Sequence, residues 1–413
     1  MIFKKICGYI KFYFSNKKRN IILIIALILF LTELILNIVS GVLISTIVDQ
    51  QAAERWDQDS RVAQVSLFFT ESRMITPDDI NKLEYMLEKK MSEVGIIQEE
   101  EEEETQPSGK KIVDTVDIQK PSDVVTEPDD TPEEVKVYAS CYSAQGISTI
   151  KFESKKAENI DTIGVSGDFF LFHPMELVNG SYFSPDELMK DRIVVDEELA
   201  WQLFGSDDIV GQCVTIGGIN HYIAGVVKRD GGRLNEAAGL SKSFVYMSYE
   251  SLARYGTIFS GRTESKEISE DGATINNGGI NCYEIVMPDP VEGLAKRLVK
   301  ESSGVEDMYV EAVDNTNRYS FFALAEVISK FGIRSMWGKP IYYPYWENVA
   351  KAWEDILAFI LLIRIICIVV VAVIAAVLIV SAYRHKTWTV AGIVRFIADK
   401  KYDYEARKKL SGK

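Results

Sequence analysis

Apolar residues are concentrated in two long runs, one near each end of the chain, with about 300 mostly polar residues between them. The runs cover residues 21–48 and 356–383. A helix needs about 20 apolar residues to cross the ~30 Å hydrocarbon layer of a bilayer, and each run is long enough. The pattern therefore predicts two transmembrane helices that flank one large domain, residues 49–355, on a single side of the membrane.

The charged flanks of these runs predict the orientation. Residues 1–20 carry six basic residues and no acid, and residues 384–413 carry nine basic residues against three acids. Short basic flanks stay in the cytoplasm, so both termini are predicted to be cytoplasmic and the middle segment to be exported. The first run is too long for a signal peptide and no small-x-small site closes it, which favours a retained anchor.

The net charge of the middle segment restricts its partners. The whole chain carries −14, but with Glu33, Arg364 and the two flanks set aside, 30 basic and 56 acidic residues remain, a net charge of −26. A domain this acidic repels nucleic acid, so DNA and RNA binding are not expected.

Two segments beside the first run are predicted to be helical. Residues 1–20 place an apolar stripe opposite lysines, which indicates an interfacial amphipathic helix on membrane lipid; the stripe is Phe3, Ile6, Tyr9, Ile10 and Tyr13. Residues 46–59 contain neither Gly nor Pro. They are predicted to continue the first transmembrane helix as a stalk.

The middle segment mixes strand and helix patterns. Residues 61–70 alternate like a strand, and Thr76-Pro77 followed by two acids predicts a helix start. A second strand–helix–strand pattern covers residues 283–313, so the two units are predicted to close one split α+β lobe. Residues 160–250 are dense in short strands and predict a mainly β lobe. Residues 99–134 are acidic and rich in Pro and Thr, which indicates a flexible insertion, with a calcium or basic-partner site as the alternative.

Catalytic and metal-binding patterns are weak. The three histidines, His173, His221 and His385, lack a Cys or second His at ligand spacing, so neither zinc nor Ser-His-Asp hydrolysis is expected. Of the five cysteines, Cys141, Cys213 and Cys282 fall in the middle segment, where one disulfide is left open. No Walker A motif occurs. We therefore predict a non-catalytic chain without a cofactor or metal.

Two charges, Glu33 and Arg364, interrupt the apolar runs. Charges inside a bilayer are costly and are usually paired. If the first helix leaves the bilayer near Val42 and the second enters near Asp355, both charges lie at the same depth. We hypothesise that they form an ion pair; the alternative is that Arg364 snorkels outward or faces a helix of another subunit.

A series of short motifs follows the first run in a fixed order. They are Val165-Ser166-Gly167-Asp168-Phe169-Phe170, Gly180-Ser181-Tyr182-Phe183, Ile193-Val194-Val195-Asp196-Glu197-Glu198-Leu199-Ala200 with Leu203-Phe204-Gly205 and Val210-Gly211-Gln212, and Ala224-Gly225-Val226-Val227-Lys228. This series resembles the periplasmic core domain of MacB-type ABC transporter permeases, the wider family that includes FtsX-like permeases. Most of these residues have a structural reading too, since Gly205 can end a helix and the aromatic residues can fill a core.

The resemblance implies a bacterial cytoplasmic membrane as the location, and it implies partners. Such permeases act with an ABC-type ATPase, and they usually have three transmembrane helices after the periplasmic domain, whereas one follows here. The chain is therefore expected to be a two-helix half-permease completed by a second permease subunit or by a homodimer. The alternative is that the two-helix form works as a regulatory subunit. The basic tail, residues 384–413, could dock on the ATPase or lie on lipid, and its candidate coupling residues are Arg384, Lys386, Trp388 and Arg395.

Two functions are compatible with this sequence. In the first, the chain is a membrane subunit that couples ATP hydrolysis by a partner to a domain acting on a peptide, lipoprotein or cell-envelope substrate. In the second, it is a stand-alone membrane-anchored ligand-binding or adhesion protein that has no ATPase.

Overall fold

The structure is a computed structural model that describes residues 17–57, 60–97, 137–184, 187–260, 279–334, 340–384 and 398–403. It divides into two compact units, Met1–Ser45 with Ile356–Lys413, and Thr46–Asp355. We call the second unit the sheet domain. The acidic insertion and most of the predicted amphipathic helix and basic tail lie outside the described residues.

The first unit is built from two long helices. Helix α2 (Lys17–Ser45) and helix α11 (Tyr345–Arg384) are both long and apolar enough to cross a membrane. At 1.5 Å per residue, 20 residues of either helix span about 30 Å. Helix α11 is continuous from its first residue in the sheet domain, so the apolar run is the continuation of a helix that begins before it.

The sheet domain contains one mixed sheet. Its strands are β1 (Val62–Phe69), β2 (Ala139–Phe152), β3 (Lys155–Gly167), β4 (Glu176–Gly180), β5 (Arg192–Asp196), β6 (Cys213–Ile216), β7 (Ile219–Lys228), β8 (Phe244–Ser248), β9 (Thr257–Ile258), β10 (Cys282–Pro288) and β11 (Val310–Asp314). The order is β11-β1-β10-β2-β3-β8-β5-β7-β4, with β6 on β2 and β7 and with β9 on β2. Strands β3 and β8, and β5 and β7, are parallel pairs.

The other helices of the sheet domain lie before, between and after these strands in the chain. They are α3 (Ala52–Trp56), α4 (Pro77–Glu93), α5 (Phe169–Phe172), α6 (Glu197–Leu203), α7 (Arg233–Asn235), α8 (Tyr249–Tyr255), α9 (Leu294–Ser302) and α10 (Phe321–Ser329), with the helical turns η1 (Val48–Gln50) and η2 (Glu236–Leu240). Helix α4 begins where the sequence predicts, because Thr76 accepts a hydrogen bond from the Asp79 backbone N–H and the Asp79 side chain accepts one from the Thr76 N–H.

The split α+β lobe is confirmed. Strand β1 pairs antiparallel with both β10 and β11, and α4 packs against α9. Strand β10 also pairs with β2, so the sheet continues without a break into the β-rich part. The two predicted lobes therefore share one sheet.

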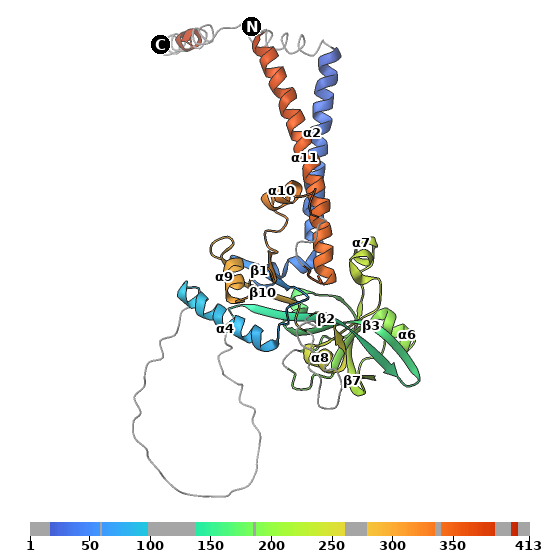
Figure 1. The fold of residues 1–413 in the computed structure, drawn as a ribbon. Helices are drawn as coiled ribbons and strands as arrows, with labels where there is room; N and C mark the ends of the chain where they lie inside the picture. Colours follow the sequence, from blue (N-terminus) through green and yellow to red (C-terminus); the bar gives the residue numbers. More distant parts are fainter. Residues whose placement is uncertain are drawn as a thin grey trace, which may run out of the picture. The chain divides into compact units, whose positions relative to one another are not determined.

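The sheet, drawn as arrows in Figure 1, separates two hydrophobic cores, one on each face. Helices α4, α6, α8 and α9 contribute to the first core. Helices α3 and α5 and the first turn of α11 contribute to the second. Strand β1 is buried along its whole length because it lies between the two cores.

The predicted helical stalk after the first transmembrane helix is wrong. Helix α2 ends at Ser45, and the chain then turns through η1 into the short helix α3. The turn is favoured because Ala52 and Ala53 are buried in the second core and Arg55 donates from Nη2 to the Leu171 carbonyl at 2.8 Å. Burial against the sheet outweighs the helical propensity of a segment without Gly or Pro.

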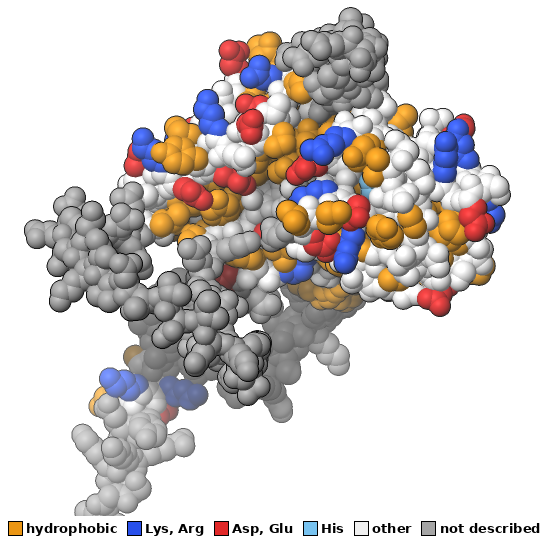
Figure 2. All heavy atoms as spheres, turned by 90° about the horizontal axis from the view of Figure 1, so that it is seen from below, with side chains coloured by type: hydrophobic (Ala, Val, Ile, Leu, Met, Phe, Trp, Pro, Cys, Tyr) orange, Lys and Arg blue, Asp and Glu red, His pale blue; other side chains and the backbone are white. Residues whose placement is uncertain are grey.

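The face of the sheet domain seen in Figure 2 is chemically mixed. Basic, acidic and apolar side chains are intermingled over its described part. The sheet domain also carries exposed ion pairs, such as Arg61–Glu292 at 3.7 Å. Such exposed pairs contribute little to stability.

Candidate functional site: a buried polar network at the base of helix α11

Helix α11 begins in the second core of the sheet domain. The Trp346 side chain is 1% exposed, and its ring lies 5.6 Å from Phe169 and 4.2 Å from the His173 ring, centroid to centroid. The next residue, Glu347, is a carboxylate that is also 1% exposed. A buried carboxylate requires charged or hydrogen-bonding partners, since desolvation is otherwise too costly.

Arg318 is the main partner of that carboxylate. Its Nη1 and Nη2 donate to the two oxygens of Glu347 at 2.6 and 2.7 Å, and its Nε pairs with Glu354, about two turns further along α11. Arg318 lies in the loop between β11 and α10 and is 5% exposed. The planar guanidinium fork thus ties this loop to two positions of α11.

The polar contacts continue from Arg318 through the sheet. Arg318 Nη1 donates to Asn315 Oδ1 at 3.1 Å. Asn315 donates to Ser66 Oγ on β1 at 2.7 Å, and Ser66 donates to Glu284 Oε1 on β10 at 2.7 Å. Glu284 Oε2 lies 2.5 Å from His173 Nε2, and His173 Nδ1 lies 3.0 Å from Asp49 Oδ1. We call this set the buried polar network: Asp49, Ser66, His173, Glu284, Asn315, Arg318, Glu347 and Glu354.

Each end of this network lies close in the chain to one of the two apolar helix segments. Asp49 lies in η1, four residues after the end of α2. Glu354 lies in α11, two residues before the apolar run that starts at Ile356. Within the sheet domain, the network therefore connects the two segments that lead into the apolar helices, and it does so across strands β1 and β10.

Burial and charge set the protonation of the network. Burial disfavours the charged imidazole of His173, but the Glu284 charge, followed by the hydrogen bonds and the Asp49 charge, outweighs burial and raises its pKa to about 9. Burial raises the pKa of Glu347, and the Arg318 charge opposes that shift. At neutral pH, His173 is thus a cation held between two carboxylates.

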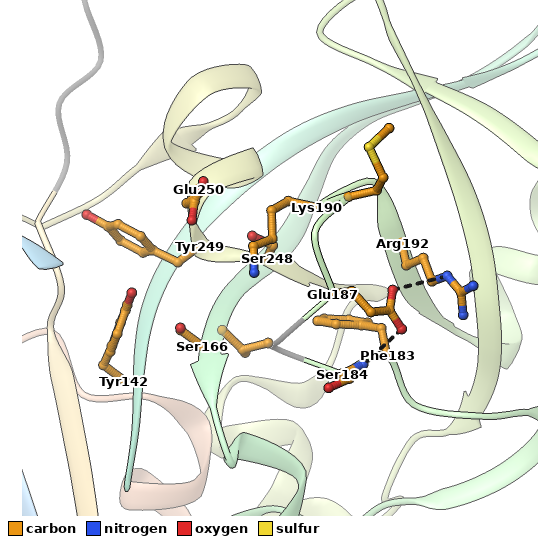
Figure 3. Close-up of a pocket in the computed structure, with 12 residues that line it drawn as sticks. Tyr142, Ser166, Phe183, Ser184, Glu187, Lys190, Arg192, Ser248, Tyr249 and Glu250 are labelled. Atoms are coloured by element: carbon orange, nitrogen blue, oxygen red, sulfur yellow. Dashed lines mark hydrogen bonds and ion pairs between the residues drawn. The ribbon is translucent and has the colours of Figure 1, made fainter. Parts of the chain in front are cut away.

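The described part of the sheet domain has hollows of different sizes. The hollow in Figure 3, beside Tyr142, Ser166 and Tyr249, has a volume of about 20 Å³, room for little more than one water molecule. A second hollow of about 190 Å³ lies next to Tyr342, Tyr345 and Asn348. These two are smaller than the ~300–1,000 Å³ of typical ligand pockets. Two wider hollows, of about 580 Å³ beside Trp201 and Arg229 and about 690 Å³ beside Tyr222, fall within that range.

The described residues contain neither a metal-binding cluster nor a disulfide. Among them, no group of three or more His, Cys, Asp or Glu residues could hold a metal ion. Cys141, Cys213, Cys282 and Cys367 are free thiols, so the disulfide left open from the sequence is not formed among them. Burial raises the pKa of the Cys141 and Cys282 thiols, which makes them poor nucleophiles.

Comparison with known families identifies the family to which this chain belongs. The family described as the MacB-like periplasmic core domain matches residues 38–278, more than half of the chain. The chain belongs to this family. It is a membrane protein of the MacB/FtsX-like ABC permease group, with a large α+β extracytoplasmic domain flanked by two apolar helices. The match extends on both sides of residues 160–250, where the short sequence motifs lie.

Two curated relatives are similar in sequence to this chain over shorter stretches. The chain is 36% identical over 77 residues to "Macrolide export ATP-binding/permease protein MacB" of Chromobacterium violaceum, which covers 18% of this chain and 12% of the relative. It is 26% identical over 162 residues to "Macrolide export ATP-binding/permease protein MacB 2" of Aeromonas hydrophila subsp. hydrophila, covering 39% and 23%. The chain thus matches less than a quarter of the length of either relative.

Solved structures give a weaker likeness. The extracellular domain of the noncanonic ABC-type transporter YknZ from Gram-positive bacteria aligns with a TM-score of 0.32 at 14% identity, over 60% of this chain and 99% of that one. The periplasmic region of MacB from Actinobacillus actinomycetemcomitans aligns with a TM-score of 0.35 at 11% identity, over 67% and 94%.

In this MacB-like chain, the two intramembrane charges lie side by side within the helical unit. Arg364 Nη2 is 3.2 Å from Glu33 Oε1 and also donates to Asn37 Oδ1 at 2.7 Å. The role of this contact in assembly stays a prediction. Of the candidate coupling residues, Arg384 is the last residue of α11, and Lys386, Trp388 and Arg395 lie outside the described residues.

Reversal of either intramembrane charge should impair assembly. We expect Glu33→Arg or Arg364→Glu to lower the yield of monodisperse protein severalfold, because each leaves two like charges in hydrocarbon at a cost of about 2.5–3.5 kcal/mol per unpaired charge. The double variant should restore the yield, measured by size-exclusion chromatography after detergent extraction. Leu34→Arg combined with Arg364→Glu is the matched control and should not be rescued. If the charge-swapped double variant fails as badly as the singles, the pair has no role in assembly.

The buried polar network was not predicted from the sequence. Its members are far apart in the chain, and the contacts between them are set by the sheet register. One local signal existed: Glu284 interrupts the otherwise uncharged strand Cys282–Pro288. A lone carboxylate in a strand buried on both sides needs a partner, and here Ser66 and His173 supply it.

Proposed function

We propose that this chain is the membrane subunit of an ABC-type complex in which a separate cytoplasmic ATPase moves the apolar helices and the sheet domain responds outside the cytoplasm. Both termini would lie in the cytoplasm. A second permease subunit or a second copy of the chain would complete the membrane part. The extracytoplasmic target would be a peptide, a lipoprotein or another component of the cell envelope.

The continuity of α11 is the observation that carries this proposal. One helix of 40 residues runs from Tyr345, in the second core of the sheet domain, to Arg384 at the basic tail. A helix without a break transmits displacement or rotation along its axis better than a flexible linker does. An anchored binding domain would not need such a rigid connection.

The buried polar network also supports this proposal, because it attaches the segments next to the apolar helices to the sheet. It fixes the first turns of α11 to strands β1 and β10 through Arg318 and Asn315, and it reaches Asp49 just after α2. A movement of either segment would therefore strain directional, charge-assisted contacts in the sheet domain. Packed and hydrogen-bonded elements of this kind respond by discrete rearrangement rather than by gradual bending.

Coupling to an ATPase is tested by copurification with an activity readout. We expect the tagged full chain, purified from its native host in mild detergent, to carry vanadate-sensitive Mg-ATPase activity. That activity should be lost when residues 384–413 are deleted. A full-length control, Arg384→Gln with Lys386→Gln and Arg395→Gln, keeps the length of the tail and tests whether its charge is required. A full chain that purifies well folded and without ATPase activity would instead favour the stand-alone binding protein.

A further inference from the structure

Helix α10 exposes an unusual amount of apolar surface for its size. Seven of its nine residues are apolar. Leu324 and Val327 point inward and are buried, but Phe321 and Phe322 are 56% and 82% exposed. The turn that follows α10 exposes a further apolar side chain, Ile333, at 61%. Large apolar side chains clustered on one surface element mark a contact with a partner or with lipid.

The same segment is tied to a defined level of α11. Arg334, at its end, pairs with Glu354 and lies 2.6 Å from Asp355 Oδ1 through its Nε. At the other end, the Tyr319 hydroxyl donates to the Ala350 carbonyl at 3.4 Å. Figure 1 shows α10 beside this part of α11. The residue after Asp355 is Ile356, the first of the apolar run that crosses the membrane.

We propose that α10 and the turn 331–334 form a lipid-contacting element that lies in the headgroup region of the outer leaflet. A rise of 1.5 Å per residue places Glu354 and Asp355 within about 3 Å of the start of the apolar run along the helix axis. The headgroup region on each side of the hydrocarbon layer is several ångströms thick. An apolar element fixed beside Glu354 and Asp355 therefore lies within reach of the lipid headgroups.

The chemistry of the segment suits that environment. Aromatic side chains are enriched at the membrane–water interface, where Phe321 and Phe322 would lie. The charges on the exposed side compensate one another, because Lys330 pairs with Glu326 at 2.5 Å and Arg334 is neutralised by two carboxylates of α11. The helix N-terminus is also satisfied, since the Ser320 side chain accepts from the Ala323 N–H at 3.3 Å. The segment can thus enter a low-dielectric layer without an uncompensated charge.

The experiment places a nitroxide label on α10 in the full chain. Phe322→Cys and, in a second variant, Ile333→Cys are labelled after Cys7 and Cys213 are replaced by serine. The protein is reconstituted in nanodiscs of phosphatidylethanolamine and phosphatidylglycerol. Collision of the label with oxygen, which concentrates in lipid, is compared with collision with a water-soluble nickel chelate. Tyr85→Cys on α4, an aromatic position that is 67% exposed, is the matched control, and a background chain without an added cysteine corrects for labelling of residual cysteines.

Accessibility to the two reagents distinguishes whether lipid, water or protein surrounds α10. Lipid contact predicts that at residues 322 and 333 the ratio of oxygen to nickel accessibility is severalfold higher than at residue 85. A ratio equal to that at residue 85 means that α10 faces water, which overturns the proposal. Low accessibility to both reagents means that a second copy or a partner protein covers α10, which overturns it as well. Both label sites are exposed, so failure to fold is not expected, and the circular dichroism spectrum of each variant checks this.

Discussion

Replacing Arg318 with methionine is expected to lower the free energy of unfolding of the sheet domain by about 3–5 kcal/mol, since the change removes one partner of a buried charge pair. Methionine has nearly the length of the arginine stem and preserves much of the packing. It leaves Glu347, which is 1% exposed, with Lys351 at 3.8 Å as its remaining ion-pair partner. The destabilisation comes from this uncompensated carboxylate more than from lost contact area.

Denaturant titration of the full chain in detergent measures this effect through the fluorescence of buried tryptophan. Arg254→Met is the matched control, since Arg254 pairs with Glu250 at 4.0 Å with both side chains largely exposed. It should change the free energy of unfolding by less than about 0.5 kcal/mol. Arg318→Met with Glu347→Leu removes the pair as a whole and should recover part of the loss. An Arg318→Met variant as stable as the control would mean that the network does not stabilise the base of α11.

The parts of the fold that depend on local sequence were predictable. Strand β1 and the capped start of α4 follow from alternation and from capping residues. The long apolar runs have a still stronger signal, because the bilayer leaves few alternatives to a helix. The ordered series of short motifs was by itself enough to indicate the family.

The candidate site was not predictable in the same way. Ser66 and Glu284 become neighbours only because β1 and β10 pair in one particular register, in which these two residues are opposite each other. His173 carries no local mark of its carboxylate partners, which lie 124 and 111 residues away in the chain. The turn after α2 likewise depends on burial of Ala52 and Ala53 in a core formed by distant segments. Such long-range choices override the propensities that sequence patterns report.

The position of His173 between Asp49 and Glu284 predicts a pH-dependent stability that His173→Gln should abolish. The pKa of His173 is raised from 6.5 in the unfolded chain to about 9 in the folded protein, so the folded state binds the proton more tightly. The resulting stabilisation is fully present below about pH 6.5 and is lost as the pH rises through about 9. Its upper limit is roughly 3–4 kcal/mol, since one pKa unit corresponds to about 1.4 kcal/mol.

The stability difference between wild type and His173→Gln, measured by denaturant titration from pH 5.5 to 9.5, should therefore be largest at the acidic end and shrink steadily above about pH 6.5. His221→Gln is the matched control, because the buried His221 ring hydrogen-bonds the Ile219 carbonyl rather than a carboxylate, and burial outweighs the Asp191 charge and lowers its pKa. A neutral buried histidine destabilises the fold as the pH falls below 6.5, which is the opposite sign. His221→Gln should keep the decline at alkaline pH. A difference between wild type and His173→Gln that is flat between pH 6.5 and 9 would show that His173 is not charged in the folded protein. The network would then hold its two carboxylates without a cation between them.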